Sequence, residues 1–98
     1  MTIKGITPTD EFIIKDILSK FFDKYTFYYY GSRVKGDFTP LSDLDILVKG
    51  SQPFNLNDKE ELKNAFDISN LPYIVNFTDY YSTSQEFYKL IEKDLVQI

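Results

Sequence analysis

Hydrophobic residues near the start of the chain recur at the spacing of an amphipathic helix. Before them, Thr7 can act as an N-cap, Pro8 takes the first helical position and Asp10 places a negative charge in the first turn. The apolar side chains that follow cover about half of the helix circumference, more than a surface helix needs. They are Phe12, which lies off the stripe, Ile13, Ile14, Ile17, Leu18, Phe21 and Phe22. The pattern predicts a helix from Pro8 to about residue 22, whose surplus apolar surface packs in the core or against a partner.

Three later segments have the composition and length of β-strands. Residues 25–30 are mostly aromatic and stop at Gly31, and residues 45–49 are mostly aliphatic and stop at Gly50. Residues 73–78 follow a Leu-Pro pair that breaks the preceding helical pattern. We therefore predict three strands.

Two further helices are predicted, one before and one after the third strand. The first is capped by Asn57 or Asp58, and the second is capped by Ser84 and extends over about 85–95. Their apolar faces consist of Leu62, Ala65 and Phe66 in the first, and of Phe87, Leu90, Ile91 and Leu95 in the second. The element order is αβ(turn)βαβα. This order predicts an α/β (α+β) fold, in which helices pack against a small mixed β-sheet.

Composition then narrows the chemistry. The 98 residues include 11 Lys+Arg and 15 Asp+Glu, for a formal net charge of −4, and no Cys or His. The length predicts a single domain, 1–98, with one core. The missing Cys and His exclude disulfides, zinc sites built on those residues and mechanisms that use a histidine base. If the protein is an enzyme, we expect its catalysis to rely on carboxylates and bound metal ions.

Charge and hydropathy also bear on partners and location. The acidic balance argues against binding a polymeric nucleic acid. No run approaches the ~18 consecutive apolar residues that a membrane span requires. The first residues lack the basic start and apolar stretch of a signal peptide. We expect a cytoplasmic protein that associates with neither a membrane nor a nucleic-acid polymer.

A Gly-Ser turn directly after the first predicted strand is a candidate phosphate site. Gly31 allows a sharp turn and a close approach to a ligand, and the freed N–H groups and the Ser32 hydroxyl can hold a phosphate. Arg33 and Lys35 add two positive charges nearby in the sequence. Taken alone, this segment more often represents an ordinary polar turn.

Two aspartates at the start of the second predicted strand form a candidate metal site. Side chains alternate along a strand, so Asp43 and Asp45 project from the same face. A Mg²⁺ ion between two such carboxylates relieves their repulsion and can also hold substrate phosphates. Taken alone, aspartates at a strand end are common and carry little information.

The two features gain specificity from their spacing. Ten residues separate Ser32 from Asp43, enough for a short helix and a loop that bring the turn alongside the carboxylate pair. This arrangement resembles the signature of the DNA polymerase β-like nucleotidyltransferase superfamily. The motif Gly-Ser-Arg-x-x-Gly followed by Ser-Asp-x-Asp is similar to that of its minimal nucleotidyltransferase (MNT) branch. The resemblance extends over essentially the whole chain.

The resemblance implies a Mg²⁺-dependent transfer of a nucleoside monophosphate, AMP from ATP in the first instance, to an acceptor hydroxyl. In this scheme Gly31 and Ser32 hold the β- and γ-phosphates, and Asp43 and Asp45 bind the metals. Arg33 and Lys35 lie near the phosphates and offset their charge, although Lys35 is equally well explained as a surface lysine. Because this branch resembles the antitoxin half of bacterial HEPN/MNT pairs, the implied acceptor is a hydroxyl of a HEPN-type partner protein.

The sequence departs from this pattern at the third strand. Members of the family carry a third catalytic carboxylate there, and the matching position is Asn76. An amide oxygen can contact a metal, but it brings no charge and cannot accept a proton from the acceptor hydroxyl. Asp79 lies three residues on, so strict alternation points it to the opposite face. It replaces the missing carboxylate only if a bulge or the strand end redirects it, and otherwise it begins the next turn.

Three interpretations of Asn76 stay open: a slow enzyme, a nucleotide binder without turnover, or a site completed by another chain. Separately, three functions compete: an active transferase that modifies a partner protein, an MNT module that neutralises its HEPN partner by contact alone, and, less favoured, transfer to an antibiotic or another small molecule. Tyr80 or Tyr81 can stack on a nucleobase, but aromatic residues in strands usually belong to the core. The apolar C-terminal residues 95–98 are either core or an interface with a partner or a second copy.

Overall fold

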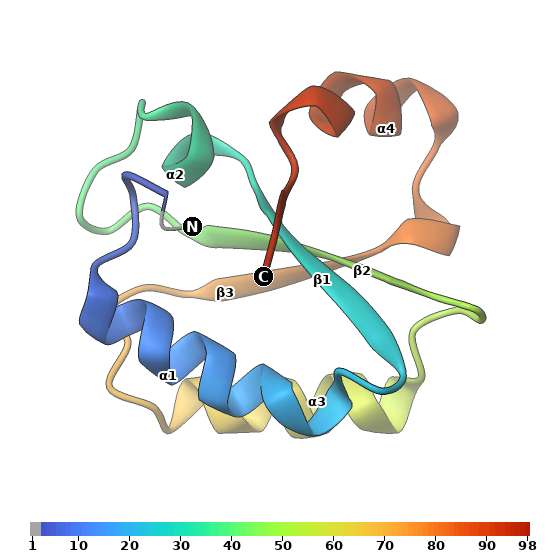
Figure 1. The fold of residues 1–98 in the computed structure, drawn as a ribbon, viewed down its shortest axis with the longest axis horizontal. Helices are drawn as coiled ribbons and strands as arrows, with labels where there is room; N and C mark the ends of the chain where they lie inside the picture. Colours follow the sequence, from blue (N-terminus) through green and yellow to red (C-terminus); the bar gives the residue numbers. More distant parts are fainter. Residues whose placement is uncertain (1–2) are drawn as a thin grey trace.

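The computed structural model describes residues 3–98. Four α-helices alternate with four strands, and 3₁₀ turns follow α1, β3 and α4 (Figure 1). The helices are α1 (Pro8–Leu18), α2 (Ser32–Lys35), α3 (Leu56–Asp67) and α4 (Gln85–Ile91). The strands are β1 (Tyr25–Tyr30), β2 (Leu44–Gly50), β3 (Val75–Asp79) and β4 (Val96–Gln97). The 3₁₀ turns are Ser19–Phe21, Tyr80–Ser82 and Glu92–Asp94.

The strands form one mixed sheet in the order β3-β2-β1-β4. β1 is antiparallel to both β2 and β4, whereas β2 and β3 run parallel. The parallel pair is connected through α3, as parallel neighbours require a crossover. The predicted mixed sheet with packed helices is confirmed.

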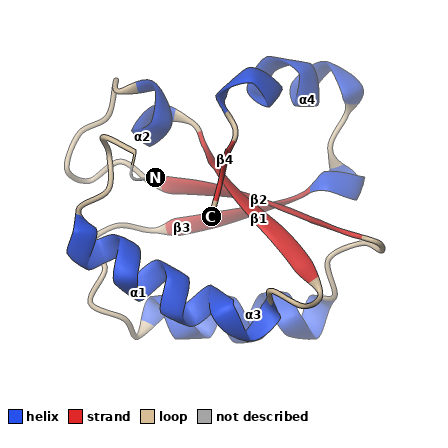
Figure 2. Cartoon of the chain, viewed as in Figure 1, coloured by secondary structure: helices blue, strands red, loops and turns tan. Residues whose placement is uncertain are grey.

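Helices cover both faces of this sheet. α1 and α3 lie side by side along one face, while α4 lies on the opposite face (Figures 1 and 2). The larger hydrophobic cluster fills the space between the sheet and the α1–α3 layer. It includes Ile14, Leu18, Phe27, Tyr29, Leu44, Ile46, Val48, Leu62 and Phe66. A smaller cluster centres on Tyr30, Leu47 and Ile91, on the α4 side.

The first helix begins as predicted and ends earlier. Thr7 caps it by accepting a hydrogen bond from the Asp10 N–H at 3.1 Å. The α-helix ends at Leu18 and continues as a 3₁₀ turn, so the predicted end at residue 22 is wrong. Ile14 and Leu18 are fully buried, whereas Phe12 is 73 % exposed. The side chain that lies off the apolar stripe is thus left in solvent.

The C-terminal residues differ most from the prediction. α4 ends at Ile91, and its predicted apolar face does not pack as a unit, because Ile91 is buried while Leu90 is 68 % exposed. A fourth strand follows, in which Val96 pairs with Tyr29 of β1. The strand covers the part of the β1 edge at Tyr28 and Tyr29 and so blocks that part from pairing with another chain. Val96 packs against the main core, which accounts for part of the apolar C-terminus.

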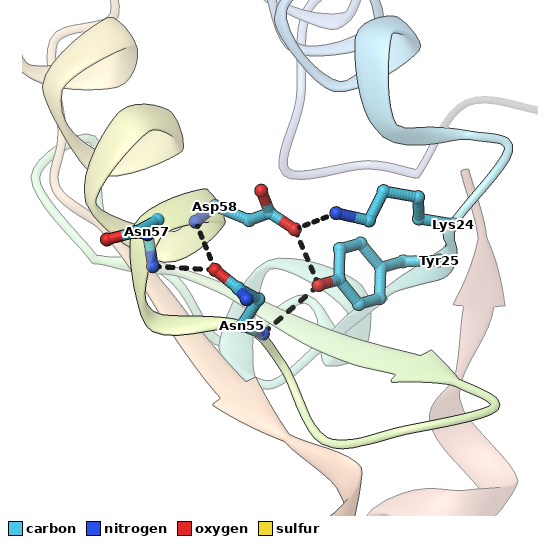
Figure 3. Close-up of polar contacts among 5 residues, drawn as sticks. All are labelled: Lys24, Tyr25, Asn55, Asn57 and Asp58. Carbon is cyan, nitrogen blue, oxygen red and sulfur yellow. Dashed lines mark hydrogen bonds and ion pairs between the residues drawn. The ribbon is translucent and has the colours of Figure 1, made fainter.

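A polar cluster fixes the start of α3 (Figure 3). It lies at the beginning of β1, the opposite end of the strand from Gly31. Asn55, rather than Asn57 or Asp58, is the N-cap, and its side chain accepts from both of those N–H groups. The Asp58 carboxylate accepts hydrogen bonds from Lys24 Nζ at 2.6 Å and from the Tyr25 hydroxyl at 2.7 Å. The cluster ties the first turn of α3 to β1.

Asp58 is expected to make the stability of the protein pH-dependent. Hydrogen bonds from Lys24 and Tyr25 hold the pKa of the Asp58 carboxyl below its usual 3.8. A lowered folded-state pKa stabilises the fold above the unfolded value, and this contribution disappears as pH falls through the folded value. Chemical denaturation across the acid range should therefore show a steeper loss of stability in the wild type than in Asp58→Asn. Equal slopes would contradict the assignment.

Within residues 3–98, no helix has both the length and the apolar character needed to cross a membrane.

Candidate nucleotidyltransferase site

The pairing register brings three distant segments to one end of the sheet. Tyr30, the last residue of β1, lies opposite Asp45 of β2, and Asp45 lies beside Asn76 of β3. Leu44 and Ile46 point into the main core, so Asp45 projects from the other face of β2, the face that α4 covers. The turn at Gly31, the aspartates and Asn76 therefore share one corner of the molecule.

The two aspartates converge on one side chain. The Asn76 amide nitrogen donates to Asp43 Oδ2 at 2.9 Å and lies 3.5 Å from Asp45 Oδ1. Asp43 precedes β2 and is exposed, whereas Asp45 is partly buried. Burial raises the pKa of the Asp45 carboxyl, the hydrogen bond from Asn76 opposes this, and the charge of Asp43 raises the pKa further. The two carboxylates therefore repel each other when both are ionised, and a cation between them would relieve that repulsion.

Asp45→Asn is expected to raise the melting temperature of the metal-free protein near neutral pH. A carboxyl whose folded-state pKa is raised disfavours folding when ionised, so a neutral isostere removes that penalty. The gain should vanish at acidic pH, where the wild-type carboxyl is protonated in both states. Thermal unfolding at the two pH values checks this, with the exposed Asp37→Asn as the matched control. A lower melting temperature at neutral pH would contradict it.

Gly31 is required by the position of Asp45. Its backbone has φ 88° and ψ −159°, a region that is essentially restricted to glycine. A Cβ at this position would collide with Asp45 Oδ2. The turn is therefore packed directly against one of the two carboxylates, and Ser32 follows as the first residue of α2. The close approach explains the glycine at this position of the motif.

Arg33 is buried and makes contacts that the sequence did not indicate. Its side chain is only 4 % exposed, and its guanidinium donates to backbone carbonyls instead of facing outward from the turn. The acceptors are Gly5 O at 2.6 Å, Ser42 O at 3.0 Å and Pro40 O at 3.0 Å. With these N–H groups engaged, the Arg33 side chain links backbone segments in this structure, and its predicted contact with phosphate stays a prediction. Lys35, at the end of α2, is exposed, and its contact with phosphate stays a prediction.

Asp79 does not join the site. It lies opposite Val48, three register positions from Asn76. Its carboxylate accepts from the Tyr81 N–H at 3.1 Å and the Ser82 hydroxyl at 3.3 Å, so it caps the following 3₁₀ turn. The structure therefore supports the interpretation in which Asp79 begins the turn after β3.

Tyr80 and Tyr81 lie at the other end of β3 from the aspartates. Tyr80 lies four residues after Asn76 along extended backbone, roughly 13 Å away. The Tyr81 hydroxyl donates to Gly50 O at 2.7 Å, and the ring of Tyr80 packs edge-on against Tyr88. The stacking role proposed for them from the sequence is therefore not supported by their position.

The aromatic residue beside the site is Tyr30, which sequence reasoning assigned only to a strand. Its hydroxyl shares a 2.6 Å hydrogen bond with Thr78 Oγ1, and its ring lies edge-on to the partly exposed Phe87 of α4. The position of Tyr30 as the last strand residue before Gly31 was the signal that could have identified it.

The donor set suits a hard divalent cation. Within residues 3–98 no cluster of three His, Cys, Asp or Glu side chains is present, so the set comprises two carboxylates, toward which Asn76 turns its amide nitrogen, a hydrogen-bond donor and not a metal ligand. The oxygens of Asp43 and Asp45 already converge on a single hydrogen-bond donor. Magnesium is commonly held by one or two carboxylates together with substrate phosphates and water. The residues present therefore fit Mg²⁺ in the company of a nucleotide.

A mixed sheet with a Gly-Ser turn after one strand and an Asp-x-Asp pair at the head of its neighbour defines a nucleotidyltransferase. The profile of the nucleotidyltransferase domain family matches residues 13–97, and the chain belongs to that family. The enzyme class and the nucleotidyltransferase fold that the motif predicted are confirmed.

Two individual proteins resemble the chain closely. One is the probable protein adenylyltransferase MntA of Haemophilus influenzae, 38 % identical over 86 residues, an alignment that covers 88 % of this chain and 75 % of that protein. The other is a chain in a crystal structure of a toxin–antitoxin with AMP-PNP. The two chains superpose with a TM-score of 0.72 at 25 % identity, and the match covers 90 % of this chain and 71 % of the solved one. Both similarities extend over most of the chain.

Proposed function

We propose that the protein transfers AMP from ATP to a hydroxyl of a partner protein, and that it is the antitoxin of a HEPN/MNT pair. The observation that carries the proposal is the convergence of Asp43, Asp45 and Asn76 beside the Gly31 turn. The name of the relative, a protein adenylyltransferase, favours AMP and a protein acceptor. The similarity to a toxin–antitoxin crystallised with AMP-PNP favours a toxin as that partner and ATP as the nucleotide.

In this proposal each part of the site has one task. Asp43 and Asp45 would hold Mg²⁺, which supplies charge neutralisation for the triphosphate and the leaving pyrophosphate. Gly31 and Ser32 bind the β- and γ-phosphates, with Lys35 adding charge. Asn76 orients the carboxylates through its amide. The residues 1–98 would act as one minimal, cytoplasmic domain, and the partner would supply acceptor specificity.

The competing function is a module that neutralises its partner by contact alone. The observation that favours it is Asn76, because an amide cannot take the proton of the acceptor hydroxyl. If the protein does transfer AMP, the partner would have to supply the general base that position 76 lacks.

Asn76→Asp is expected to accelerate AMP transfer by about tenfold or more, because a positioned general base contributes ~10²–10⁴. The same change at exposed Asn70 should leave the rate as it is, since that residue lies outside the site. Initial rates of adenylylation for the two variants make the comparison. No increase in the Asn76→Asp variant would show that the missing carboxylate does not limit the reaction.

The proposal is tested by intact-mass spectrometry of the product of the neighbouring gene after incubation with the protein, ATP and Mg²⁺. We expect the partner to gain adenylyl groups, and peptide mapping to place them on hydroxyl side chains. A stable complex in which the partner's mass never changes would favour neutralisation by contact.

A further inference from the structure

The buried charge of Arg33 connects the segments that carry the site. Among residues 3–98, it is the one charged side chain with less than a tenth of its surface exposed, at 4 %. It belongs to α2 and directly follows Ser32, the predicted phosphate ligand. A cation is costly to bury unless its donors are satisfied, so its partners indicate what it does.

One set of partners lies in the loop that leads to Asp43. Arg33 Nε donates to Ser42 O at 3.0 Å, and an Nη atom donates to Pro40 O at 3.0 Å. The loop is itself a closed turn, because the Thr39 N–H donates to Ser42 Oγ at 2.8 Å. Ser42 is the residue before Asp43, so the guanidinium fixes the backbone immediately ahead of a proposed metal ligand.

A second partner lies in the segment that leads to Asn76. The guanidinium carbon sits 3.7 Å from the centre of the Tyr73 ring, a close cation–π contact. The Tyr73 hydroxyl in turn donates to Asp10 of α1 at 3.0 Å. Tyr73 is two residues before β3 begins, so this contact ties Arg33 to the segment that leads into that strand.

The third partner is the N-terminal segment, which lies outside the 13–97 range matched by the family profile. The Arg33 guanidinium donates to Gly5 O at 2.6 Å, and the Gly5 N–H donates back to Arg33 O at 3.1 Å. A Cβ on Gly5 would lie 2.5 Å from the Arg33 Cβ and 2.6 Å from its Cα. The N-terminal backbone is thus pressed against α2, and only a glycine fits there.

We propose that Arg33, locked in place by Gly5, is a positioning residue that sets the geometry of Asp43 and Asn76 for metal binding. The guanidinium suits this task because its planar fork presents several donors in fixed directions, which a lysine cannot reproduce. The inference rests on the proposed metal site, and it assigns to Arg33 a role other than direct contact with phosphate.

The direction in which the affinity for a divalent cation changes when Arg33 is replaced distinguishes a positioning role from a simple effect of its charge. Removing a cation near two carboxylates should, by Coulomb's law alone, leave the affinity for a divalent cation unchanged or strengthen it. Loss of a positioning residue should weaken the affinity instead. Residues that orient metal ligands typically change metal affinity by about 10–100-fold when they are replaced.

The test measures Mn²⁺ affinity of the nucleotide-free protein by electron paramagnetic resonance. We expect Arg33→Gln, Arg33→Lys and Gly5→Ala each to weaken binding by about tenfold. Gly5→Ala retains every charge and disturbs only the packing against Arg33. The exposed neighbour Lys4→Gln is the control for charge and should bind Mn²⁺ at least as well as the wild type. Two-dimensional amide spectra establish that each variant is folded.

Each result then has a defined meaning. Wild-type affinity in Gly5→Ala and Arg33→Lys would overturn the positioning role while leaving the proposed function intact. If the wild type itself bound no Mn²⁺, the proposed metal site would fail, and the amide signals of Asp43 and Asn76 would decide the inference instead. They should move in Gly5→Ala and stay fixed in Lys4→Gln. Unfolding of all three variants would assign Arg33 to global stability and overturn the inference.

Discussion

Replacing Asp43 or Asp45 with asparagine is expected to lower the rate of AMP transfer by about 10³-fold or more. Phosphoryl transfer depends almost entirely on positioning and on neutralising the charge of the phosphates, and a lost electrostatic element costs ~10³–10⁵ in rate. Both carboxylates approach the Asn76 amide nitrogen, at 2.9 and 3.5 Å, and within residues 3–98 no third acidic side chain joins them that could replace a lost one. The two variants should be similarly inactive.

The measurement is the initial rate of partner adenylylation at saturating ATP and Mg²⁺. Asp37→Asn provides the matched control, because it makes the same chemical change at an exposed loop position between α2 and β2. A melting temperature of Asp45→Asn at or above that of the wild type would show that its loss of activity does not come from unfolding. An aspartate variant that retained a tenth of the wild-type rate would contradict the assignment of that carboxylate.

Gly31→Ala is expected to remove activity and to destabilise the protein as well. A non-glycine residue in this backbone region costs on the order of 1–3 kcal/mol, and the new methyl group would also collide with Asp45 Oδ2. Either the turn or the carboxylate must move, and a displacement of about 1 Å can lower a rate by ~10²-fold. Denaturant unfolding and adenylylation rates measure the two effects.

Gly36→Ala is the matched control for this variant. Gly36 also has a positive φ, 98°, but a Cβ there would meet no heavy atom within 4 Å apart from those of its neighbours along the chain. The Gly36→Ala variant should therefore lose about 1–2 kcal/mol of stability from backbone strain while it retains transfer activity. Equal loss of activity in the two variants would mean that backbone strain, and not contact with Asp45, makes Gly31 necessary.

The geometry of the site core could be anticipated because it follows from strand periodicity and short spacings. Alternation places Asp43 and Asp45 on one face, and the structure has Asp45 on the face opposite to the buried Leu44 and Ile46. The match of Asn76 to the third-carboxylate position rested on the family pattern. The parallel register then sets Asn76 beside Asp45. Local rules are sufficient where the residues lie on neighbouring strands.

The role of Arg33 could not be anticipated, because the destination of a long side chain depends on tertiary contacts. A cation two residues after a glycine turn is usually exposed, yet here the carbonyls of Gly5 and Pro40 and the ring of Tyr73 enclose it. β4 was missed for a related reason. Two residues carry no periodicity, and only the open edge of β1 makes Val96–Gln97 a strand.

The most direct test of the proposed transfer is the fate of radioactive label when the protein, Mg²⁺ and the product of the neighbouring gene are incubated with ATP labelled at either the α- or the γ-phosphate. We predict that label from the α-position becomes covalently attached to the partner, that label from the γ-position does not, and that Asp43→Asn abolishes the attachment. Tight association of the two proteins without attachment of α-label, or attachment of γ-label, would contradict AMP transfer.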